Sequence, residues 1–264
     1  MIFCSLYSGS SGNSIFVGTD NTKVLIDAGL AGKKIDEALK NINEDTSRID
    51  AIFVTHEHSD HIKGVGVLSR KYNIPIYANE DTWIVMKDFI GKIKDENIKI
   101  IAKRSTITIK DMDIKCFNIP HDAVSPMGYT IFSKGKQVSI ATDFGTFTEE
   151  IKSNIKDSDV VLLESNHDVS TLKFGPYPYS LKRRILSEIG HLSNEDCGKA
   201  ILQILKSNKK KQIILGHLSN TNNHPDLAYE TVKGFLTDNN IAVGEDVTLQ
   251  MAKRNSPSGY IKLS

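Results

Sequence analysis

The sequence contains few cysteines and no long hydrophobic run, and both absences narrow its setting. Only three of its 264 residues are cysteine, Cys4, Cys116 and Cys197, and an odd number of widely separated cysteines is not a disulfide framework. This usage is typical of a reducing compartment, so we expect all three to be small buried residues. The N-terminus lacks the charged start and apolar core of a signal peptide, and no stretch approaches a membrane span. We therefore expect a cytoplasmic protein without a membrane partner.

An excess of charge of either sign is also absent. Lysine and arginine total 33 against 32 acidic residues, for a formal net charge of +1, which excludes a strongly basic coat for nucleic acid. A local basic surface stays open. Lys182, Arg183 and Arg184 follow Tyr177 and Tyr179, and basic residues beside aromatic ones can guide a nucleic-acid strand. A solvated helix face is the commoner explanation of such a run.

No linker rich in proline, glycine or serine divides the chain, and it has no repeat or low-complexity segment, so residues 1–264 are expected to form one domain. Periodicity predicts strands near Ile2–Leu6, Ser14–Val17, Lys23–Asp27, Asp50–Thr55, Pro75–Ala78, Ile98–Ile101, Ser105–Ile109, Asp113–Ile119, Gly128–Ser133, Val138–Thr142, Val160–Glu164, Gln212–Leu215 and Asp246–Gln250. It predicts helices near Ala31–Asn41, Ile62–Lys71, Asp81–Ile90, Tyr179–Ile189, Asn194–Ser207 and Pro225–Asp238. Strands mixed with helices in this way indicate an α/β protein.

The most informative stretch present is Thr55–His61, read Thr-His-Glu-His-Ser-Asp-His, because it follows a buried strand. His56 and His58 are two residues apart, so at an extended strand end their side chains leave on the same side and can hold one metal ion. Asp60 and His61 lie just beyond and face a second ion. A solvent-facing polar loop is the alternative, but three histidines among the eight in the chain make this the less favoured interpretation.

Further candidate ligands follow other apolar strands. His121 comes after the strand that ends near Ile119, Asp143 after the one that ends at Thr142, and His217 after the one that ends at Leu215. Proteins of the α/β class build their sites at the carboxyl ends of strands. A single histidine at a strand end is as often idle, but several strand ends together with the cluster indicate a site with two metal ions.

The run from His56 to His61 has the form H-x-H-x-D-H, and with Lys23–Gly29 it resembles the metallo-β-lactamase superfamily over nearly the whole chain. The resemblance implies a four-layer αββα sandwich of two mixed sheets flanked by helices. It assigns the first metal ion to His56, His58 and His121, and the second to Asp60, His61 and His217. In the same way it makes Asp143 the bridge between the ions, and Asp27 a buried carboxylate that orients the site without binding metal.

These ligands suit several metals and one kind of reaction. Five imidazoles and two carboxylates fit Zn²⁺ or Mn²⁺, and also Fe. Many β-lactamases use a cysteine for the second metal, whereas the matching residue here is Asp143, which resembles the thioester and phosphodiester hydrolases of the superfamily. Two neighbouring ions can hold a bridging hydroxide and neutralise both oxygens of an in-line displacement. Phosphodiester cleavage is therefore chemically natural.

Two identical motifs, Gly190–Asn194 and Gly216–Asn220, both read Gly-His-Leu-Ser-Asn. The pair resembles the late motifs of nucleolytic superfamily members such as the enzymes that process the 3′ end of tRNA. This resemblance implies that His191 stabilises the phosphorane or protonates the leaving oxygen. In the mechanism we expect, Asp60 orients the nucleophile. The alternative is that His191 merely begins the helix over Glu195–Leu205, for which Ser193 or Asn194 is a plausible N-cap.

At a finer level, five segments of the chain together resemble the WalJ (YycJ) subgroup of the superfamily, which is associated with 5′-to-3′ exonuclease activity on double-stranded DNA. The segments that carry this resemblance are Ser8–Ser14, His56–His61, Glu164–Asp168, Gly190–Asn194 and Gly216–Asn223. We therefore expect a phosphodiesterase with two divalent metal ions that digests nucleic acid, with DNA favoured over RNA. A small-molecule hydrolase acting on a thioester or phosphodiester is the alternative, and a non-catalytic metal-stabilised protein is a third. The oligomeric state stays open.

Substrate-binding candidates come from the serine-rich and asparagine-rich segments. The loop over Ser8–Ser14 offers hydroxyl and backbone N–H groups that can hold a phosphate, although such a loop is often just a turn. Glu164 and Asn166 are expected to fix ligand imidazoles from behind. His224 is expected to begin a helix and not to bind metal. The residues predicted to bind substrate are Ser11, Asn13, Asn166 and Asn194.

Overall fold

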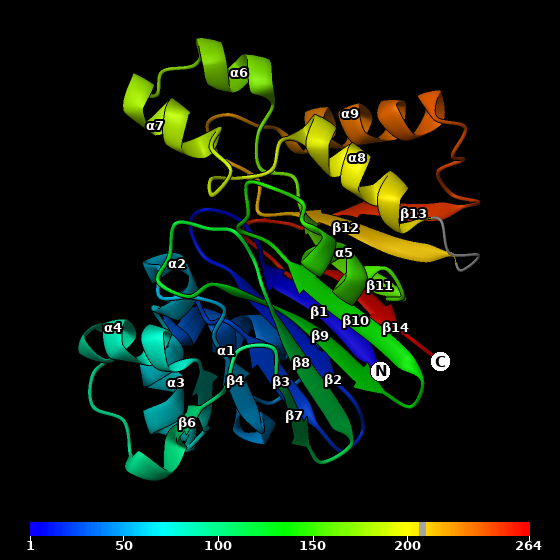
Figure 1. Cartoon of the computed structure of the whole chain (residues 1–264). Coiled ribbons are helices and arrows are strands. Elements are labelled where there is room, and N and C mark those ends of the chain that lie inside the picture. Colours follow the sequence, from blue (N-terminus) through cyan, green and yellow to red (C-terminus); the bar gives the residue numbers. More distant parts are fainter. Residues whose placement is uncertain (206–209) are drawn as a thin grey trace.

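Two seven-stranded sheets face each other at the centre of the computed structural model, which describes residues 1–205 and 210–264 (Figure 1). The first sheet has the order β14-β1-β2-β3-β4-β5-β6. Strands β1 to β3 and β14 pair antiparallel, whereas β3, β4, β5 and β6 run parallel. The bounds are β1 (Ile2–Tyr7), β2 (Ser14–Gly18), β3 (Lys23–Ile26), β4 (Ala51–Phe53), β5 (Ile76–Ala78), β6 (Ile98–Ile100) and β14 (Ser258–Lys262).

The second sheet has the order β13-β12-β11-β10-β9-β8-β7 and is also mixed. Strands β7 to β10 form an antiparallel meander, and β10 to β13 run parallel. The bounds are β7 (Thr106–Ile109), β8 (Met112–Asn118), β9 (Met127–Ser133), β10 (Lys136–Ala141), β11 (Val160–Glu164), β12 (Lys211–Gly216) and β13 (Val247–Met251). Strands β2 and β11 are buried at every residue because both faces of each sheet are covered.

Helices cover the outer face of each sheet, as Figure 1 shows. Helices α1, α3 and α4 pack on the first sheet, and α5, α8 and α9 pack on the second. Helices α6 and α7 project beyond the sandwich at the end where α8 begins (Figure 1). The bounds are α1 (Gly32–Asn41), α2 (Ser59–Ile62), α3 (Val65–Tyr72), α4 (Glu80–Ile90), α5 (Glu149–Ile155), α6 (Val169–Phe174), α7 (Tyr179–Ile185), α8 (Asn194–Ile204) and α9 (Pro225–Asp238), with short 3₁₀ turns over Thr46–Arg48 and Asp95–Asn97.

Three apolar clusters hold these layers together. The middle cluster lies between the sheets and joins Phe3 and Phe53 of the first sheet to Tyr129 and Leu162 of the second. The outer clusters join each sheet to its helices, through side chains such as Ile35 of α1 on one side. Similar contacts from α5, α8 and α9 complete the other side. Since each fully buried large apolar side chain contributes roughly 1.5–3 kcal/mol, these three interfaces define the four-layer sandwich.

The predicted fold class, two mixed sheets flanked by helices, is confirmed. The helix predicted over Ile62–Lys71 is wrong in detail, because α2 and α3 are separate. Gly64 divides them where the chain passes another loop so closely that a Cβ would lie 2.2 Å from the carbonyl oxygen of Leu30. Helix α7 ends at Ile185, four residues before the predicted end.

Three short elements were not predicted from the sequence, namely α5, α6 and β14. Helix α6 buries only Leu172, and β14 only Ile261, so neither has an apolar period to detect. Helix α8 is described up to Ile204, and Ser207, its predicted end, lies outside the described residues.

The three cysteines are free and buried, as expected. Burial raises the pKa of the Cys4 thiol to about 11, so it is protonated and unreactive at neutral pH. Among the helices in residues 1–205 and 210–264, none is long and apolar enough to cross a bilayer.

Candidate metal and catalytic site

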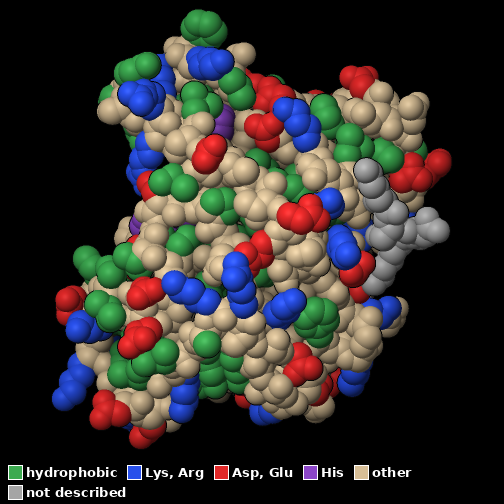
Figure 2. Space-filling view, viewed as in Figure 1, with side chains coloured by type: hydrophobic (Ala, Val, Ile, Leu, Met, Phe, Trp, Pro, Cys, Tyr) green, Lys and Arg blue, Asp and Glu red, His purple; other side chains and the backbone are tan. Residues whose placement is uncertain are grey.

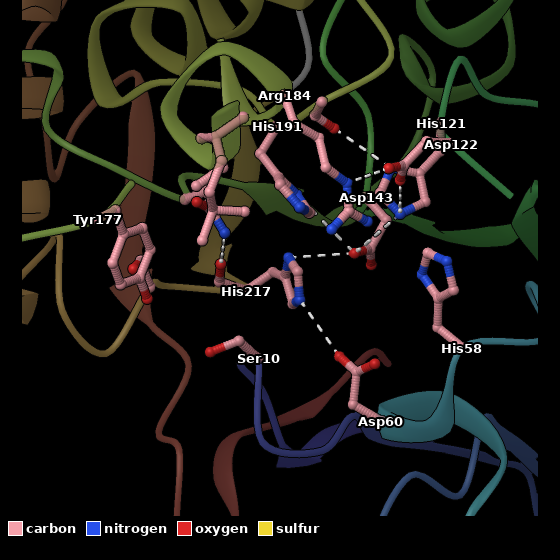
Figure 3. Close-up of a pocket in the computed structure, with 15 residues that line it drawn as sticks. Ser10, His58, Asp60, His121, Asp122, Asp143, Tyr177, Arg184, His191 and His217 are labelled. Atoms are coloured by element: carbon pink, nitrogen blue, oxygen red, sulfur yellow. Dashed lines mark hydrogen bonds and ion pairs between the residues drawn. The ribbon is translucent and has the colours of Figure 1, made fainter. Parts of the chain in front are cut away.

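Loops that follow β1, β4, β8, β10, β11 and β12 meet at the end of the sandwich, where they surround a cavity of about 240 Å³. Histidine and carboxylate side chains from both sheets line it, and α7 closes one wall with Leu181, Arg184 and Ile185. In Figure 3, Asp60 and His58 enter from the first sheet, and His121, Asp143 and His217 face them from the second. All seven predicted metal ligands therefore lie together.

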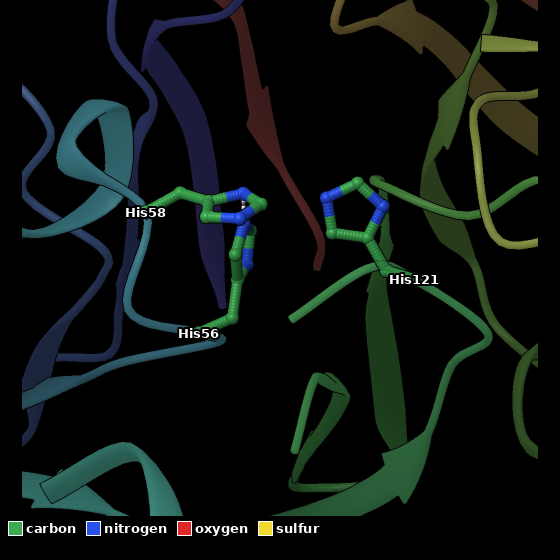
Figure 4. A group of neighbouring side chains, drawn as sticks. All are labelled: His56, His58 and His121. Carbon is green, nitrogen blue, oxygen red and sulfur yellow. Dashed lines mark hydrogen bonds between the residues drawn. The ribbon is translucent and has the colours of Figure 1, made fainter. Parts of the chain in front are cut away.

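The first group consists of His56, His58 and His121. One ring nitrogen from each lies within 4.8 Å of the others. His56 and His58 come from the loop after β4, and Nε2 of His56 lies 3.1 Å from Nδ1 of His58. His121 faces them from the end of β8 (Figure 4). The prediction that His56 and His58 share one side is consistent with this geometry.

The second group consists of Asp60, His61 and His217, whose ligand atoms also lie within 4.8 Å of one another. Nε2 of His61 lies 3.6 Å from Oδ2 of Asp60, and Nε2 of His217 lies 3.9 Å from the same oxygen. Burial opposes a charge on Asp60, but the imidazoles of His61 and His217 hold the pKa of its carboxyl well below the usual range. Asp60 is therefore ionised and available as a ligand or hydrogen-bond acceptor.

Asp143 lies between the two groups. Its Oδ2 is 3.4 Å from Nε2 of His61, and its Oδ1 is 3.9 Å from Nε2 of His121 and 3.3 Å from Nδ1 of His217. It also groups with His56 and His61 as a further set of three ligand atoms. This central place is the one expected of a bridging carboxylate.

The ring orientations favour metal binding because four imidazoles are anchored through Nδ1. Nδ1 of His61 donates to Asp27 at 2.7 Å, that of His121 to the Gly190 carbonyl at 3.2 Å, and that of His217 to Glu164 at 3.0 Å. Nδ1 of His56 lies 3.0 Å from the Thr55 hydroxyl. Each ring then presents Nε2 to the centre, the orientation that outer hydrogen bonds impose on metal-ligating histidines.

The pairing of three atoms at the centre of the cluster indicates whether these residues fit divalent metal ions. Nε2 of His121, Nε2 of His217 and Oδ2 of Asp143 are buried, and none has a hydrogen-bond partner in the part of the chain that the structure describes. Buried polar atoms are normally paired, so three convergent exceptions need an explanation. Imidazole nitrogens and carboxylate oxygens are ligands for Zn²⁺ and for Mn²⁺ or Fe, and the residues therefore fit bound metal.

Asp27 orients the cluster through its hydrogen bonds to His61 and Thr55. Its carboxylate accepts from His61, from the backbone N–H of Thr55 at 2.8 Å and from the Thr55 hydroxyl at 2.8 Å. Burial opposes a charge on His61, but the carboxylates of Asp143, Asp27 and Asp60 raise its pKa to about 9. A metal ion bound through Nε2 of His61 would therefore have to displace a proton from this ring.

Backbone strain accompanies three of these residues. Asp27, Asp143 and His217 have φ of 60°, 61° and 55°, and each lies just past the end of a strand, β3, β10 or β12. Residues other than glycine rarely occupy this left-handed region, and they do so where the surrounding structure compensates. The sharp turn directs each side chain out of its strand and toward the cluster.

Glu164, at the end of β11, connects the two Gly-His-Leu-Ser-Asn motifs. Its Oε1 accepts from Nδ1 of His191 at 2.7 Å and from Nδ1 of His217 at 3.0 Å, while its Oε2 accepts from the Phe144 N–H at 2.7 Å. Burial opposes ionisation of Glu164, but both imidazoles hold the pKa of its carboxyl below the usual range. Figure 3 shows His191 and His217 on the same wall of the cavity.

The chain after Glu164 runs between the two motifs. The N–H of Ser165 donates to Gly216 and that of Asn166 to Leu192, at 3.0 and 2.9 Å. Asn194 and Ser219 return hydrogen bonds to the carbonyls of His167 and Asn166, at 2.9 and 2.8 Å. The repeated motif therefore places two histidines on either side of one carboxylate, a relation that the spacing in the sequence does not reveal.

The residues predicted to bind substrate divide into two groups. Asn166 lines the cavity, and its amide donates to the His217 carbonyl at 2.8 Å. Asn13 is buried and bonds Gly9 and His61, at 2.9 and 3.1 Å, while Asn194 is buried and accepts from Ser165 at 2.7 Å. Ser11 is exposed in its loop. The structure thus places Asn13, Asn194 and Ser11 outside the lining of the cavity.

Two other predictions concern residues near the site. His224 is the N-cap of α9 and accepts from the Asp226 N–H at 3.4 Å, so the prediction that it begins a helix is confirmed. The basic run of α7 separates in space. Lys182 donates to the carbonyls of Lys173 and Gly175 at 2.9 and 2.7 Å, and Arg184 pairs with Asp122 at the rim of the cavity.

Sequence reasoning missed Ser10 as a cavity residue and Arg254 altogether. Ser10 lines the cavity, and Nη1 of Arg254 lies 3.5 Å from the Ser10 hydroxyl, within hydrogen-bonding distance. More than two hundred residues separate Arg254 from this loop, so no local signal could have joined them.

Comparison with known proteins identifies the family to which the chain belongs. Residues 22–218 match the family model described as the β-lactamase superfamily domain. The chain is 42% identical over 243 residues to exodeoxyribonuclease YycJ of Bacillus anthracis, which covers 92% of both chains. It is 45% identical to exodeoxyribonuclease WalJ of Streptococcus pneumoniae, over 91% of this chain and 90% of the relative. The chain belongs to the metallo-β-lactamase superfamily and, within it, to the family of these two relatives. It is a metal-dependent hydrolase.

Solved structures with low sequence identity have the same fold. The metallo-β-lactamase fold protein YhfI of Bacillus subtilis superposes with a TM-score of 0.71 at 13% identity, over 97% of this chain and 98% of that one. Zn²⁺-bound PqqB of Methylobacterium extorquens superposes with a TM-score of 0.69 at 16% identity, over 98% and 100%. These matches support the sandwich architecture alone.

Proposed function

We propose that this protein is an exonuclease that hydrolyses phosphodiester bonds with two divalent metal ions, acting on double-stranded DNA from the 5′ end. The observation that carries the proposal is the convergence of six candidate ligands around a seventh, Asp143, with His191 lining the same cavity. Relatives named exodeoxyribonucleases at 42% and 45% identity support a nucleic-acid substrate. DNA is favoured over RNA on the same ground.

The proposed metal ligands are His56, His58 and His121 for one ion, Asp60, His61 and His217 for the other, and Asp143 for both. Bound there, two ions would supply Lewis acidity toward the phosphate and make water a stronger nucleophile near neutral pH. Asp60 is partly exposed to the cavity, so its free carboxylate oxygen can orient the attacking water by accepting a hydrogen bond.

His191 is the proposed general acid. Its side chain is 19% exposed, and Nδ1 is occupied by Glu164, which leaves Nε2 as the ring nitrogen free to meet the substrate. The carboxylate of Glu164 fixes the orientation of the ring, so that a proton on Nε2 can be transferred to the leaving oxygen as the P–O bond breaks. In the overall reaction, water supplies oxygen to phosphorus and a proton ends on the leaving hydroxyl.

The deciding experiment incubates Mn²⁺-loaded and Zn²⁺-loaded protein with duplex DNA labelled at either end, single-stranded DNA, RNA and a thioester. Stepwise shortening of duplex DNA from the 5′ end, lost in Asp143→Ala, supports the proposal. Intact polymers together with a cleaved thioester would move the assignment to a small-molecule hydrolase. Tight metal binding without turnover of any ester would indicate a non-catalytic protein.

A further inference from the structure

Arg254 lies in the segment between β13 and β14 and is held against the loop over Ser8–Ser14. Its Nη1 is 3.5 Å from the hydroxyls of Ser10 and Ser11, and its Nη2 donates to the Leu218 carbonyl. Within residues 1–205 and 210–264, Arg254 forms no ion pair with a carboxylate. Burial lowers the pKa of this guanidinium, and nearby Tyr177 acts in the opposite direction. A half-buried cation without an acidic partner is costly unless it meets an anion.

The loop beside Arg254 has the chemistry of an anion site. Gly9 has φ of 147°, and a Cβ there would lie 2.8 Å from Nη1 of Arg254, so glycine lets the guanidinium approach the loop backbone. The turn at Ser10 and Ser11 is exposed, and their hydroxyls point toward the same guanidinium nitrogen. Arginine, hydroxyl groups and turn amides together are groups that recognise phosphate.

This cluster adjoins the candidate active site. Ser10 lines the cavity with the metal ligands, whereas Arg254 lines a second hollow of about 580 Å³, and Ser219 borders both. Serine and asparagine side chains line part of the second hollow together with Lys253 and Arg254, and Asp226 is the one acid among its lining residues. Leu218, Pro225, Met251 and Ala252 give the hollow an apolar wall as well. A weakly basic hollow with polar and apolar walls that continues from a hydrolytic site fits a nucleic-acid strand, which carries both phosphates and bases, better than a compact substrate.

We propose that Arg254, Ser10 and Ser11 form a subsite for a backbone phosphate of the nucleic-acid strand, next to the phosphate that is cleaved. The inference rests on the proposed nuclease function and specifies how the strand is held. Tyr177 lines the same cavity, and Figure 3 shows it and Ser10 on the side away from His58 and His121. Its ring supplies a surface on which a base attached to the held phosphate can stack. The strand then runs from the metal ligands past Ser10 into the second hollow.

The test measures binding of a labelled duplex, whose end linkages are phosphorothioates that resist hydrolysis, by fluorescence anisotropy with metal-loaded protein. Arg254→Gln is expected to weaken binding about tenfold and to reduce the slope of log affinity against log salt by about 0.9, the value for one phosphate contact. Arg254→Lys keeps the charge without the fork of donors and should recover part of the loss. The ratio of activity on DNA to activity on bis(p-nitrophenyl) phosphate should fall by about the same factor as the affinity.

Two further variants keep the result decisive. Ser11→Asp puts a carboxylate beside Arg254 on an exposed turn, so it should fold normally and weaken DNA binding even if Arg254→Gln is unstable. Lys99→Gln removes a positive charge from β6, which lies at the opposite edge of the first sheet from β14. This variant should bind DNA like the wild type. Circular dichroism melting of each variant checks the fold.

Neutral methylphosphonate linkages locate the phosphate. Placed one at a time along the strand, one linkage should weaken wild-type binding but have no additional effect in Arg254→Gln, which distinguishes an internal phosphate from a terminal one. Wild-type affinity in both Arg254→Gln and Ser11→Asp would overturn the subsite while leaving the nuclease function intact. If the wild type neither binds nor shortens DNA yet hydrolyses bis(p-nitrophenyl) phosphate, the nuclease proposal fails and the subsite fails with it.

Discussion

Asp143 has the most central place of any side chain in the cluster, between His61, His121 and His217. Asp143→Ala removes both oxygens of the proposed bridge and leaves imidazoles from the two sheets without a shared carboxylate. We expect loss of at least one of two bound ions and loss of turnover, measured by elemental analysis and by DNA hydrolysis. Asp238→Ala, at the exposed end of α9, is the matched control and should keep both. Full activity in a folded Asp143→Ala protein would contradict the assignment.

Glu164 acts through its neighbours because it is fully buried and bonds two histidines at once. Glu164→Gln keeps the shape but removes the negative charge that orients His191 and His217. Since outer-sphere partners of this kind typically contribute 10–100-fold, we expect activity or metal affinity to fall by about that factor. Glu188→Gln, at an exposed side chain, is the matched control. Unchanged activity and metal affinity in Glu164→Gln would assign Glu164 to stability alone.

His167 makes folding stability depend on pH. The ring is 1% exposed, and neither nitrogen has a hydrogen-bond partner in the described part of the chain. Burial lowers its pKa from 6.5 to about 4, so between these values the unfolded chain binds more protons than the folded one. Stability is therefore lost as pH falls from 6.5 toward 4. Relative to His167→Gln, wild-type stability should drop by about 2 kcal/mol between about pH 7.5 and about pH 5, by urea titration. Parallel curves for the two proteins would show that the imidazole keeps its ordinary pKa.

At the scale of elements, the cap of α8 contributes to the site because it joins the helix to His191. The Ser193 hydroxyl accepts from the Asp196 N–H at 3.1 Å. Ser193→Ala leaves that N–H without its cap, which typically costs about 1 kcal/mol of unfolding free energy. Urea denaturation should detect this loss, whereas Ser180→Ala on the exposed start of α7 should change stability by less than about 0.5 kcal/mol. Equal effects of the two substitutions would argue against the cap.

The elements that the sequence predicted well are those with a full apolar period. Strands β8 to β12 are buried between two layers, so their hydrophobic runs were visible, and polar residues directly after them marked the site. Helices α5 and α6 are short, and α6 presents Phe174 at 90% exposure, so pattern reasoning did not detect them. The separation of α2 from α3 follows from loop contact at Gly64, which is a tertiary effect.

The same division holds within the site. Ligands clustered in His56–His61 were predictable because a strand end brings near neighbours in sequence together. The hydrogen bonds of Glu164 to both His191 and His217 were not, because they require three segments to meet. Arg254 was missed for the same reason, since its contacts with Ser10 and Ser11 exist only after β14 pairs with β1. Local patterns therefore predicted the candidate ligands, and the fold revealed the residues that hold them in place.

At the scale of the whole molecule, the proposed metal ligands join the two sheets. His56, His58, Asp60 and His61 follow β4 of the first sheet, whereas His121, Asp143 and His217 follow β8, β10 and β12 of the second. With the imidazole rings anchored, the orphaned atoms His121 Nε2, His217 Nε2 and Asp143 Oδ2 of the second sheet lie at this seam, next to the proposed ligands of the first sheet. Without ions, these buried polar atoms stay unpaired, at a cost to the folded state.

Removal of metal should therefore destabilise the whole sandwich and not only the loops. A ligand at 1,000 times its Kd adds about 4 kcal/mol to the folded state, which corresponds to a Tm about 10 °C higher for a chain of this size. We expect a chelator to lower the Tm of the wild type by about this amount, measured by calorimetry. If the two sheets unfold together, the unfolding transition should stay single and should not broaden. Asp143→Ala, which lacks the shared carboxylate, should show a smaller shift on chelation. An equal shift in both proteins, or none in the wild type, would mean that the ions do not couple the sheets, and the stability of the seam would then rest on the apolar cluster of Phe3, Phe53, Tyr129 and Leu162 alone.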